Sequence, residues 1–251
     1  MPLRTAMTHI SKSQIKLIRS LRLKKFRDQL GLFVAEGSKC IGELRRAFDL
    51  DLLVTPENAT TVELEQISSM RTPQGQVAVF RKPPETPLPQ PDDGLVLVLD
   101  GVQDPGNLGT IIRTCDWFGV RHIVCSADTA DCFSPKVVQA AMGALARVCV
   151  CYTVDLAQYI TTASQVSHCP VYGTLLDGRD MYLPDAMPEK GRGLVVMGNE
   201  GNGISPEIRA LVSHPLFIPS YAQDAVESLN VAVATAVILA EFRRPVNTRI
   251  P

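Results

Sequence analysis

Three short polar segments after residue 99 combine glycines with amide, carboxylate, hydroxyl and guanidinium side chains. They span residues 100–114, 197–205 and 218–234. Each segment follows an apolar run that is typical of a buried strand. Ligand sites in open parallel sheets lie beyond the carboxyl ends of the strands. The sequence therefore predicts that the three segments converge in space and build one site.

The first segment, residues 100–114, reads Asp-Gly-Val-Gln-Asp-Pro-Gly-Asn-Leu-Gly-Thr-Ile-Ile-Arg-Thr. Asn107 is a good N-cap for a helix that would run through Phe118. Arg113 would then lie nearly two turns into the helix, as the one charged residue among its neighbours. Taken alone, it is most simply a surface arginine. The alternative is a functional one, because arginine binds phosphate in a bidentate manner and keeps its proton.

The second segment, residues 197–205, spaces Gly198, Gly201 and Gly203 as GxxGxG. The dinucleotide fingerprint is GxGxxG after a first strand, whereas this run follows the fifth strand that we predict for its domain. The glycine order therefore argues against NAD binding, and no GxxxxGK[ST] motif is present for ATP phosphates. These glycines would let backbone approach a flat ligand closely, but taken alone the segment is better explained as an ordinary glycine-rich turn.

The third segment leads into a helix that we predict over residues 226–243. Ser228 and Asn230 stand near its start, before a run of small residues at 231–236. Small residues let a helix pack tightly against other backbone, so a plain buried helix explains this run. Ser228 could serve simply as the helix cap.

Composition limits the class of protein. The chain has 251 residues, 45% of them hydrophobic, and can bury a core in one large or two smaller domains. No apolar stretch approaches the roughly 18 residues of a membrane span, and basic residues interrupt the N-terminal region where a signal peptide would be apolar. A cytoplasmic protein is expected. Seven cysteines form no CxxC pair, which predicts reduced, mostly buried thiols and no metal site.

The charge distribution is more informative than the net charge of −1. Residues 1–27 hold eight basic residues and no acidic one: Arg4, Lys12, Lys16, Arg19, Arg22, Lys24, Lys25 and Arg27. Such a stretch is a candidate phosphate-contacting surface. A solvated amphipathic helix explains it equally well.

A proline-rich segment, residues 82–93, divides the chain and is predicted to be a stiff extended linker. Before it, strands at 32–36, 51–55 and 76–80 alternate with helices at 11–30, 38–48 and 61–69, which indicates a small α/β unit. After it, strands are predicted at 95–99, 122–125, 148–154, 170–176, 193–197 and 216–218. The intervening helices are 107–118, 135–147, 155–166, one from 205 and one at 226–243. This alternation predicts a parallel sheet that is covered on both faces.

In this order, the three polar segments closely resemble the SpoU/TrmH family of RNA ribose 2'-O-methyltransferases, in the SPOUT superfamily, over roughly residues 95–245. The resemblance implies an α/β methyltransferase domain, residues 94–251, with a C-terminal trefoil knot that binds S-adenosylmethionine. Phe33–Gly37 and Thr72–Gly75 resemble, more loosely, the L30e-like domain that precedes many rRNA members. This implies that residues 1–93 form an RNA substrate-binding domain.

Roles for single residues follow from the same resemblance. It implies that Asn107 and Arg113 are catalytic, and that Glu200, Ser228 and Asn230 occupy polar active-site positions. The implied cofactor-binding residues are Thr174, Leu175, Gly198, Asn199, Gly201, Ile218 and Leu229. It also implies a homodimer that pairs through the last helix.

The leading hypothesis is therefore a cytoplasmic homodimer that methylates a ribose 2'-hydroxyl of RNA, in 23S-type rRNA, without a metal or a membrane partner. The alternatives are a catalytically silent RNA-binding relative, a tRNA 2'-O-methyltransferase and a Rossmann-type nucleotide-dependent enzyme. The intact set of polar residues argues against the silent relative. A ribose hydroxyl needs deprotonation or polarisation, and Arg113 could act in proton removal or orient the hydroxyl electrostatically.

Overall fold

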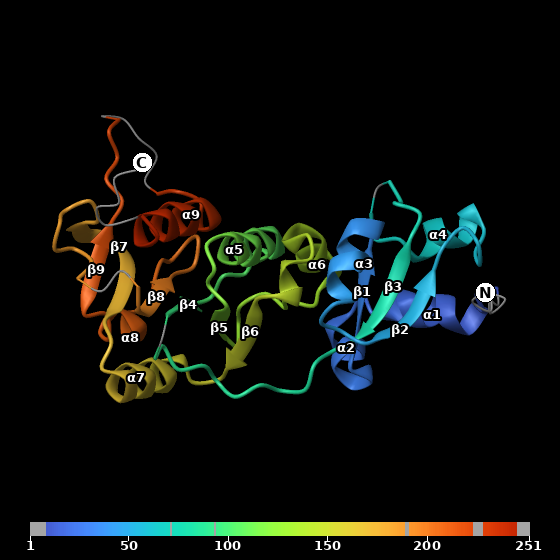
Figure 1. The fold of residues 1–251 in the computed structure, drawn as a ribbon, viewed down its shortest axis with the longest axis horizontal. Coiled ribbons are helices and arrows are strands. Elements are labelled where there is room, and N and C mark those ends of the chain that lie inside the picture. Colours follow the sequence, from blue (N-terminus) through green and yellow to red (C-terminus); the bar gives the residue numbers. More distant parts are fainter. Residues whose placement is uncertain (1–8, 71, 93, 189–190, 223–227, 245–251) are drawn as a thin grey trace, which may run out of the picture. The chain divides into compact units, whose positions relative to one another are not determined.

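The computed structural model describes residues 9–70, 72–92, 94–188, 191–222 and 228–244. The chain divides into two compact units (Figure 1). The first unit contains residues 1–84 and 131–146, and the second contains residues 85–130 and 147–251. The segment 131–146, which we expected inside the methyltransferase domain, thus packs as part of the first unit.

The first unit is built on a three-stranded antiparallel sheet of order β1-β3-β2. The strands are β1 (Leu32–Glu36), β2 (Leu50–Val54) and β3 (Val77–Arg81). The helices are α1 (Lys12–Ser20), α2 (Lys24–Leu30), α3 (Ser38–Leu44), α4 (Thr61–Ile67) and α6 (Pro135–Ala141), followed by the 3-10 helix η1 (Ala144–Ala146). The predicted alternation of strands and helices before residue 82 is confirmed.

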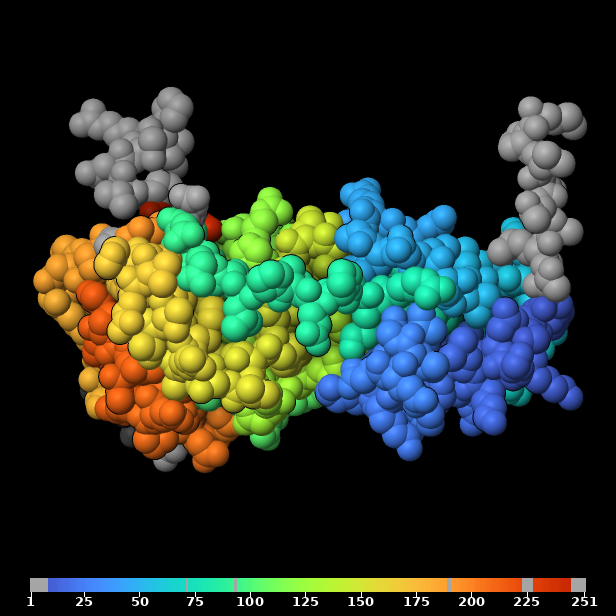
Figure 2. Space-filling model, turned by 90° about the horizontal axis from the view of Figure 1, so that it is seen from below, coloured from blue at the N-terminus to red at the C-terminus, as the bar shows by residue number. Residues whose placement is uncertain are grey.

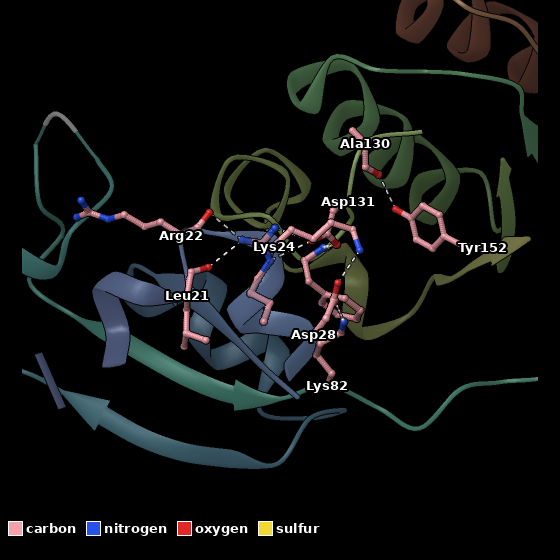
Figure 3. A network of polar contacts seen from close by, with 10 residues as sticks. Leu21, Arg22, Lys24, Asp28, Lys82, Ala130, Asp131 and Tyr152 are labelled. Carbon is pink, nitrogen blue, oxygen red and sulfur yellow. Dashed lines mark hydrogen bonds and ion pairs between the residues drawn. The ribbon is translucent and has the colours of Figure 1, made fainter. Parts of the chain in front are cut away.

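The single helix predicted over residues 11–30 is two helices, because Leu23 is extended and interrupts the helical path. The carbonyl groups left at the end of α1 are satisfied by a side chain. Arg27 Nη1 donates to the carbonyl oxygens of Leu21 at 2.8 Å and Arg22 at 2.9 Å (Figure 3). The break is thus stabilised by a buried guanidinium, which periodicity alone does not indicate.

The same guanidinium fastens the segment 131–146 into the first unit. Arg27 Nη2 and Nε donate to Asp131 Oδ2 at 2.6 and 3.0 Å, and the side chains are only 3% and 12% exposed. Nearby, the rings of Phe33 and Phe133 lie 4.8 Å apart. A buried ion pair is costly to break from one side, because the remaining charge loses its partner.

Two helices are shorter than predicted. The helix expected over residues 135–147 ends at Ala141, because Met142 and Gly143 adopt left-handed φ angles of 51° and 89°. The helix expected over 38–48 ends at Leu44.

The second unit is built on a six-stranded, all-parallel sheet of order β6-β5-β4-β8-β7-β9. The strands are β4 (Leu95–Leu99), β5 (His122–Ser126), β6 (Cys149–Thr153), β7 (Val171–Asp180), β8 (Gly193–Met197) and β9 (His214–Phe217). The helices are α5 (Pro105–Trp117), α7 (Leu156–Ser167), α8 (Pro206–Arg209) and α9 (Val231–Phe242).

Helices α5 and α9 lie on one face of this sheet, and α7 and α8 on the other (Figure 1). Every residue of β4 and β8 is buried, as expected for central strands that are covered on both faces. The predicted parallel α/β sheet is confirmed. Among the described residues, no helix has the length and apolarity needed to cross a membrane.

The second half of the proline-rich segment is fixed to the second unit. Figure 2 shows it running along the surface beside α7. The hydroxyl of Tyr159 donates to the carbonyl oxygen of Pro89 at 2.8 Å, and Ser167 Oγ donates to Asp92 Oδ1 at 2.6 Å. Residues 85–92 are therefore packed against the second unit and do not form a free linker. The functional boundary at residue 93 stays a prediction.

Candidate active site

The three polar segments begin where strands of the second unit end. Strand β4 ends at Leu99 and its neighbour β8 at Met197, and these two residues are register partners. The backbone N–H of Asp100 donates to the carbonyl of Met197 at 2.9 Å, which extends this pairing into the loops. Strand β9 ends at Phe217, separated from β8 by β7. Neighbouring parallel strands thus bring the loops to one edge of the sheet, as predicted.

Asn107 links all three segments through its side-chain amide. Its Nδ2 donates to Glu200 Oε1 at 2.8 Å, and its Oδ1 accepts a hydrogen bond from Asn230 Nδ2 at 2.9 Å. Asn107 is half-buried, whereas Glu200 and Asn230 are exposed. The sequence predicted that these three residues share a site, and the structure brings them into direct contact.

The chemistry of the three side chains fixes the orientation of each amide. An ionised carboxylate only accepts hydrogen bonds, so the NH2 group of Asn107 must face Glu200. The carbonyl oxygen of Asn107 is then left to accept from Asn230. Asn230 Oδ1 in turn accepts from the backbone N–H groups of Ala232 at 3.0 Å and Val233 at 3.3 Å. Among the described residues, these two contacts leave one N–H and one lone pair of Asn107 for a bound molecule.

The helix caps differ from the prediction. Asp104, not Asn107, caps α5: its Oδ1 accepts from the backbone N–H of Asn107 at 2.8 Å, and Pro105 occupies the first helical position. Asn107 therefore lies inside the first turn, and its side chain is released from capping for the contact with Glu200. The prediction of an Asn107 cap was wrong, because Asp104-Pro105 is the stronger start signal.

Helix α9 begins at Val231, and Asn230 is its N-cap. The predicted helix start at residue 226 lies outside the described residues. Ser228 and Leu229 precede the helix and are exposed. The simpler interpretation of Ser228, that it caps the last helix, is therefore wrong, because Asn230 is the N-cap.

The glycine-rich loop is held by the side chain of Asn199. Its Oδ1 accepts from the backbone N–H groups of Gly201 at 2.9 Å and Asn202 at 3.1 Å. Its Nδ2 donates to the carbonyl of Gly101 in the first segment at 2.6 Å. Both functional groups of this amide are thus engaged in positioning the two loops.

Gly198 is required by the close approach of the same loop to itself. A Cβ atom at Gly198 would lie 2.2 Å from the carbonyl carbon of Gly203, far inside any real contact. Asn199 and Gly203 also exchange two backbone hydrogen bonds, of 2.9 and 3.0 Å. The tight loop places Glu200 at its tip.

Two residues that connect the loops were assigned no role in the sequence analysis. Asp100 Oδ2 accepts from the backbone N–H of Ser205 at 2.7 Å and so joins the first segment to the second. Ser126, at the end of β5, accepts from the backbone N–H of Gly101 at 2.9 Å and donates to Asp128 Oδ1 at 2.5 Å. The position of Asp100, directly after a buried strand, was the available signal. Ser126 lies outside every motif.

Arg113 lies on the exposed side of α5, apart from the amide network. Six residues separate it from Asn107, which corresponds to about 9 Å along a helix axis. The apolar residues around it, Leu108, Ile111, Ile112 and Cys115, are buried as predicted.

The predicted cofactor positions lie on β7, β8 and β9 or in the loops after them. Thr174 Oγ1 donates to the carbonyl of Val196 at 3.5 Å, which places it beside the end of β8. Leu175 and Ile218 are half-buried, and Gly201 is exposed. Leu229 is 48% exposed. Glycine backbone and half-buried aliphatic side chains thus share one edge of the sheet.

A family model described as the SpoU rRNA Methylase family matches residues 94–240, more than half of the chain. The chain belongs to the SpoU rRNA methylase family. A second model, the MRM3-like substrate binding domain, matches residues 12–68 of this SpoU methylase. The resemblance drawn from the three polar segments is therefore confirmed.

Relatives align with this SpoU methylase over nearly its whole length. The 23S rRNA (guanosine(2553)-2'-O)-methyltransferase RlmP of Bacillus subtilis is 31% identical over 246 residues, which cover 92% of this chain and 96% of RlmP. A solved structure of a TrmH-family protein from Porphyromonas gingivalis is 41% identical, with a TM-score of 0.84 over 94% of this chain and 99% of that one. An AdoMet-bound rRNA methyltransferase from Sinorhizobium meliloti is 30% identical, with a TM-score of 0.82 over 95% and 97%.

Proposed function

We propose that this SpoU methylase transfers a methyl group from S-adenosylmethionine to a ribose 2'-hydroxyl of 23S-type rRNA. The observation that carries the proposal is the contact of Asn107 with both Glu200 and Asn230. Those residues come from three separated segments, and they are positions that the family resemblance assigns to the polar active site. Family membership and the relatives' activities support the reaction type.

The polar network is suited to hold a hydroxyl group. Beside its contacts within the described part of the chain, Asn107 keeps one N–H and one lone pair, and Glu200 keeps a second carboxylate oxygen, so donors and acceptors are both present. Their mutual hydrogen bonds fix the geometry before substrate arrives, and such preorganisation is the main source of catalytic stabilisation. We infer that Asn107 and Glu200 position the ribose, with Ser228 and Asn230 completing the polar wall.

We assign Arg113 an electrostatic role. A guanidinium holds its proton under ordinary conditions, so it is poorly suited to remove one. It is well suited to bind the phosphate next to the target ribose and to stabilise charge that develops on the 2'-oxygen. The exposed place of Arg113 on α5 permits such a contact.

The residues at the sheet edge fit S-adenosylmethionine. When bound, the cofactor would supply an electrophilic methyl group on its sulfonium. Gly201 exposes backbone without a side chain, and Leu175 and Ile218 offer aliphatic surface to a flat base. Gly198 is buried and allows the close turn of this loop. We propose that the cofactor is held by Thr174, Leu175, Gly198, Asn199, Gly201, Ile218 and Leu229. The side chain of Asn199 is engaged in the loop, so its cofactor contact would be made by backbone.

We propose the finer architecture as well. The C-terminal part of residues 94–251 would form the trefoil knot, and residues 1–93 would form an L30e-like RNA-binding domain. The match of residues 12–68 to a substrate-binding model supports the second assignment. The chain would act as a homodimer that pairs through α9, whose Val233 is 50% exposed. An enzyme with this substrate would work in the cytoplasm, where the rRNA is.

Ribosomal RNA is favoured over tRNA by the breadth of the alignment. RlmP aligns over nearly its full length, including the region before residue 94. A guanosine of 23S rRNA is the first target to test, because RlmP and an RlmB relative from Acinetobacter baylyi both carry that specificity in their names. Calorimetry with S-adenosylmethionine comes first: an active methylase binds it, whereas a silent RNA-binding relative does not.

Specificity is then tested by incubating the protein and S-adenosylmethionine with 23S rRNA and, separately, with total tRNA. Methylation of tRNA alone would contradict the proposed substrate and favour the alternative enzyme. Methylation of both would show that substrate choice requires a further factor.

A further inference from the structure

Cys149 and Cys151 form a pair of neighbouring thiols outside the active site. They are two positions apart on β6, so their side chains leave the same face of the sheet. Their Sγ atoms lie 3.7 Å apart, and the thiols are not joined in a disulfide. Cys151 is buried and Cys149 is half-buried. The other five cysteines, Cys40, Cys115, Cys125, Cys132 and Cys169, are all buried.

Several polar groups of the second unit surround Cys149. Cys151 adjoins it on the same strand, and Thr86 Oγ1 of the proline-rich segment lies 3.8 Å from Cys149 Sγ. His122 of β5 is its register partner. Tyr159 of α7 belongs to the same hydrophobic cluster as Cys151. The half-buried thiol thus lies among hydrogen-bonding groups and beside the imidazole of His122.

These surroundings favour the thiolate form of Cys149. The hydrogen bond from Cys151, together with Thr86 and His122, outweighs burial and lowers the pKa of Cys149 to about 5. Burial has the opposite effect elsewhere: it raises the pKa of Cys40 to about 11 and that of Cys115 further. Thiolate content and access together decide which cysteines react.

We propose that Cys149 and Cys151 are a reversibly oxidisable thiol pair, in which Cys149 attacks a hydroperoxide and Cys151 resolves the product. The Cys149 thiolate attacks one peroxide oxygen, the O–O bond breaks, and the departing oxygen takes a proton to leave as water or an alcohol. Cys149 is then a sulfenic acid. Cys151 Sγ attacks the Cys149 sulfur, the S–O bond breaks and water leaves. Two thiols are oxidised to one disulfide, and one peroxide is reduced.

The strand geometry makes the resulting disulfide easy to reduce. Residues two apart on a strand have Cα atoms about 6.4–6.8 Å apart. This is the upper end of the range that disulfides span, and a stretched bond is more reducible. Within the described residues, strand β6 lies at the edge of the sheet and pairs with β5 alone, so closing the bond disturbs one ladder of hydrogen bonds. The pair is therefore suited to respond to peroxide and to recover.

The test is site-resolved mass spectrometry on the full-length protein. Native protein is treated with iodoacetamide at pH 6, and separately with hydrogen peroxide in the presence or absence of dimedone. We expect alkylation of Cys149 while Cys40 and Cys115 stay unmodified. Peroxide should give a Cys149–Cys151 disulfide that dithiothreitol reverses. An ordinary thiol of pKa about 8.5 is under about 1% thiolate at pH 6, so the contrast should exceed tenfold.

Two variants complete the test. Cys151→Ala removes the main hydrogen bond and the resolving thiol, so alkylation of Cys149 at pH 6 should slow by about tenfold, and peroxide should stop at a dimedone-reactive sulfenic acid. If Cys151→Ala fails to fold, Cys151→Ser tests the resolving step. Cys149→Ser should leave Cys151 unoxidised. An unmodified Cys149 in native wild type, or peroxide oxidation no faster than at Cys40, would overturn the proposal.

Discussion

Replacing Asn199 by alanine tests whether the two catalytic loops depend on a single amide. The change removes two hydrogen bonds within the glycine-rich loop and the 2.6 Å bond to Gly101. At about 0.5–1.5 kcal/mol each, the three bonds are worth about 1.5–4.5 kcal/mol. Water can replace the two bonds inside the exposed loop. The bond to Gly101 has no such substitute, because it joins two segments.

Loss of that bond should let the neighbouring residue Glu200 move, and the hydrogen bond from Asn107 to Glu200 would then no longer hold Asn107 in place. If the change raises the activation free energy of methyl transfer by about 1.4–2.7 kcal/mol, the rate falls about 10- to 100-fold. Asn202→Ala is the matched control, because it removes the same type of side chain from the same loop. Asn202 bonds to Asn199 through its backbone N–H, which the substitution keeps. Single-turnover transfer to 23S rRNA, measured with saturating S-adenosylmethionine, gives the rate, and calorimetry gives the cofactor affinity.

Two results would refute this reasoning. Equal rates for Asn199→Ala and Asn202→Ala would show that the amide does not position the loops. A normal saturating rate with weakened cofactor binding would make Asn199 a cofactor ligand through its side chain. A melting temperature close to wild type is needed in both variants to read the rates.

The remaining predictions concern catalysis, assembly, RNA binding and stability. Arg113→Ala should lower single-turnover methyl transfer by at least about 100-fold with cofactor affinity nearly unchanged, and a near-normal rate would remove Arg113 from the mechanism. Analytical ultracentrifugation should show a C2 dimer that persists at micromolar concentration; an active monomer would contradict it. Changing the exposed cations Lys12, Lys16, Arg19 and Lys25 to glutamine should weaken RNA binding and make its salt dependence shallower, by up to about 0.7–0.9 per lost contact. An unchanged salt dependence of RNA binding would show that these four cations face solvent and do not contact RNA. Arg27→Met should destabilise the first unit by about 3–5 kcal/mol in urea unfolding, because Asp131 is left buried without its partner; a loss under 1 kcal/mol would show that Asp131 is readily rehydrated.

The sequence predicted those features that depend on local pattern. Apolar runs such as Leu95–Leu99 and Gly193–Met197 are strands with the predicted bounds. The meeting of the polar segments follows from parallel strand order, because neighbouring strands end at one edge. Strand order predicted that the segments meet, and the family resemblance supplied Asn107, Glu200 and Asn230 as the residues of the shared site.

Features that depend on long-range contacts were not predictable in this way. The eight basic residues were predicted to form either a phosphate-contacting surface or a solvated helix face, yet Arg27 is buried against Asp131, which lies 104 positions further along the chain. Its guanidinium also explains why the first helix is broken in two. Neither partner is recognisable in advance, because periodicity carries no information about which distant carboxylate fills a buried site.

The packing of segment 131–146 in the first unit was likewise not predictable from the sequence. Its helix signal, Ser134-Pro135, was recognised, but its packing against the first unit was not. A consequence for experiment is that deleting residues 1–93 would uncover the apolar side of α6. Substitution of exposed cations is for this reason the cleaner test of RNA binding.

The most direct test of the proposed function is ribose-methylation mapping of unmodified 23S rRNA after incubation with the purified protein and S-adenosylmethionine. The wild-type protein should introduce a 2'-O-methyl group at one nucleotide, and Asn107→Ala should leave that nucleotide unmodified while still binding the cofactor. Cofactor binding by the wild-type protein without any ribose methylation of 23S rRNA, or methylation of a base instead of a ribose, would contradict the account.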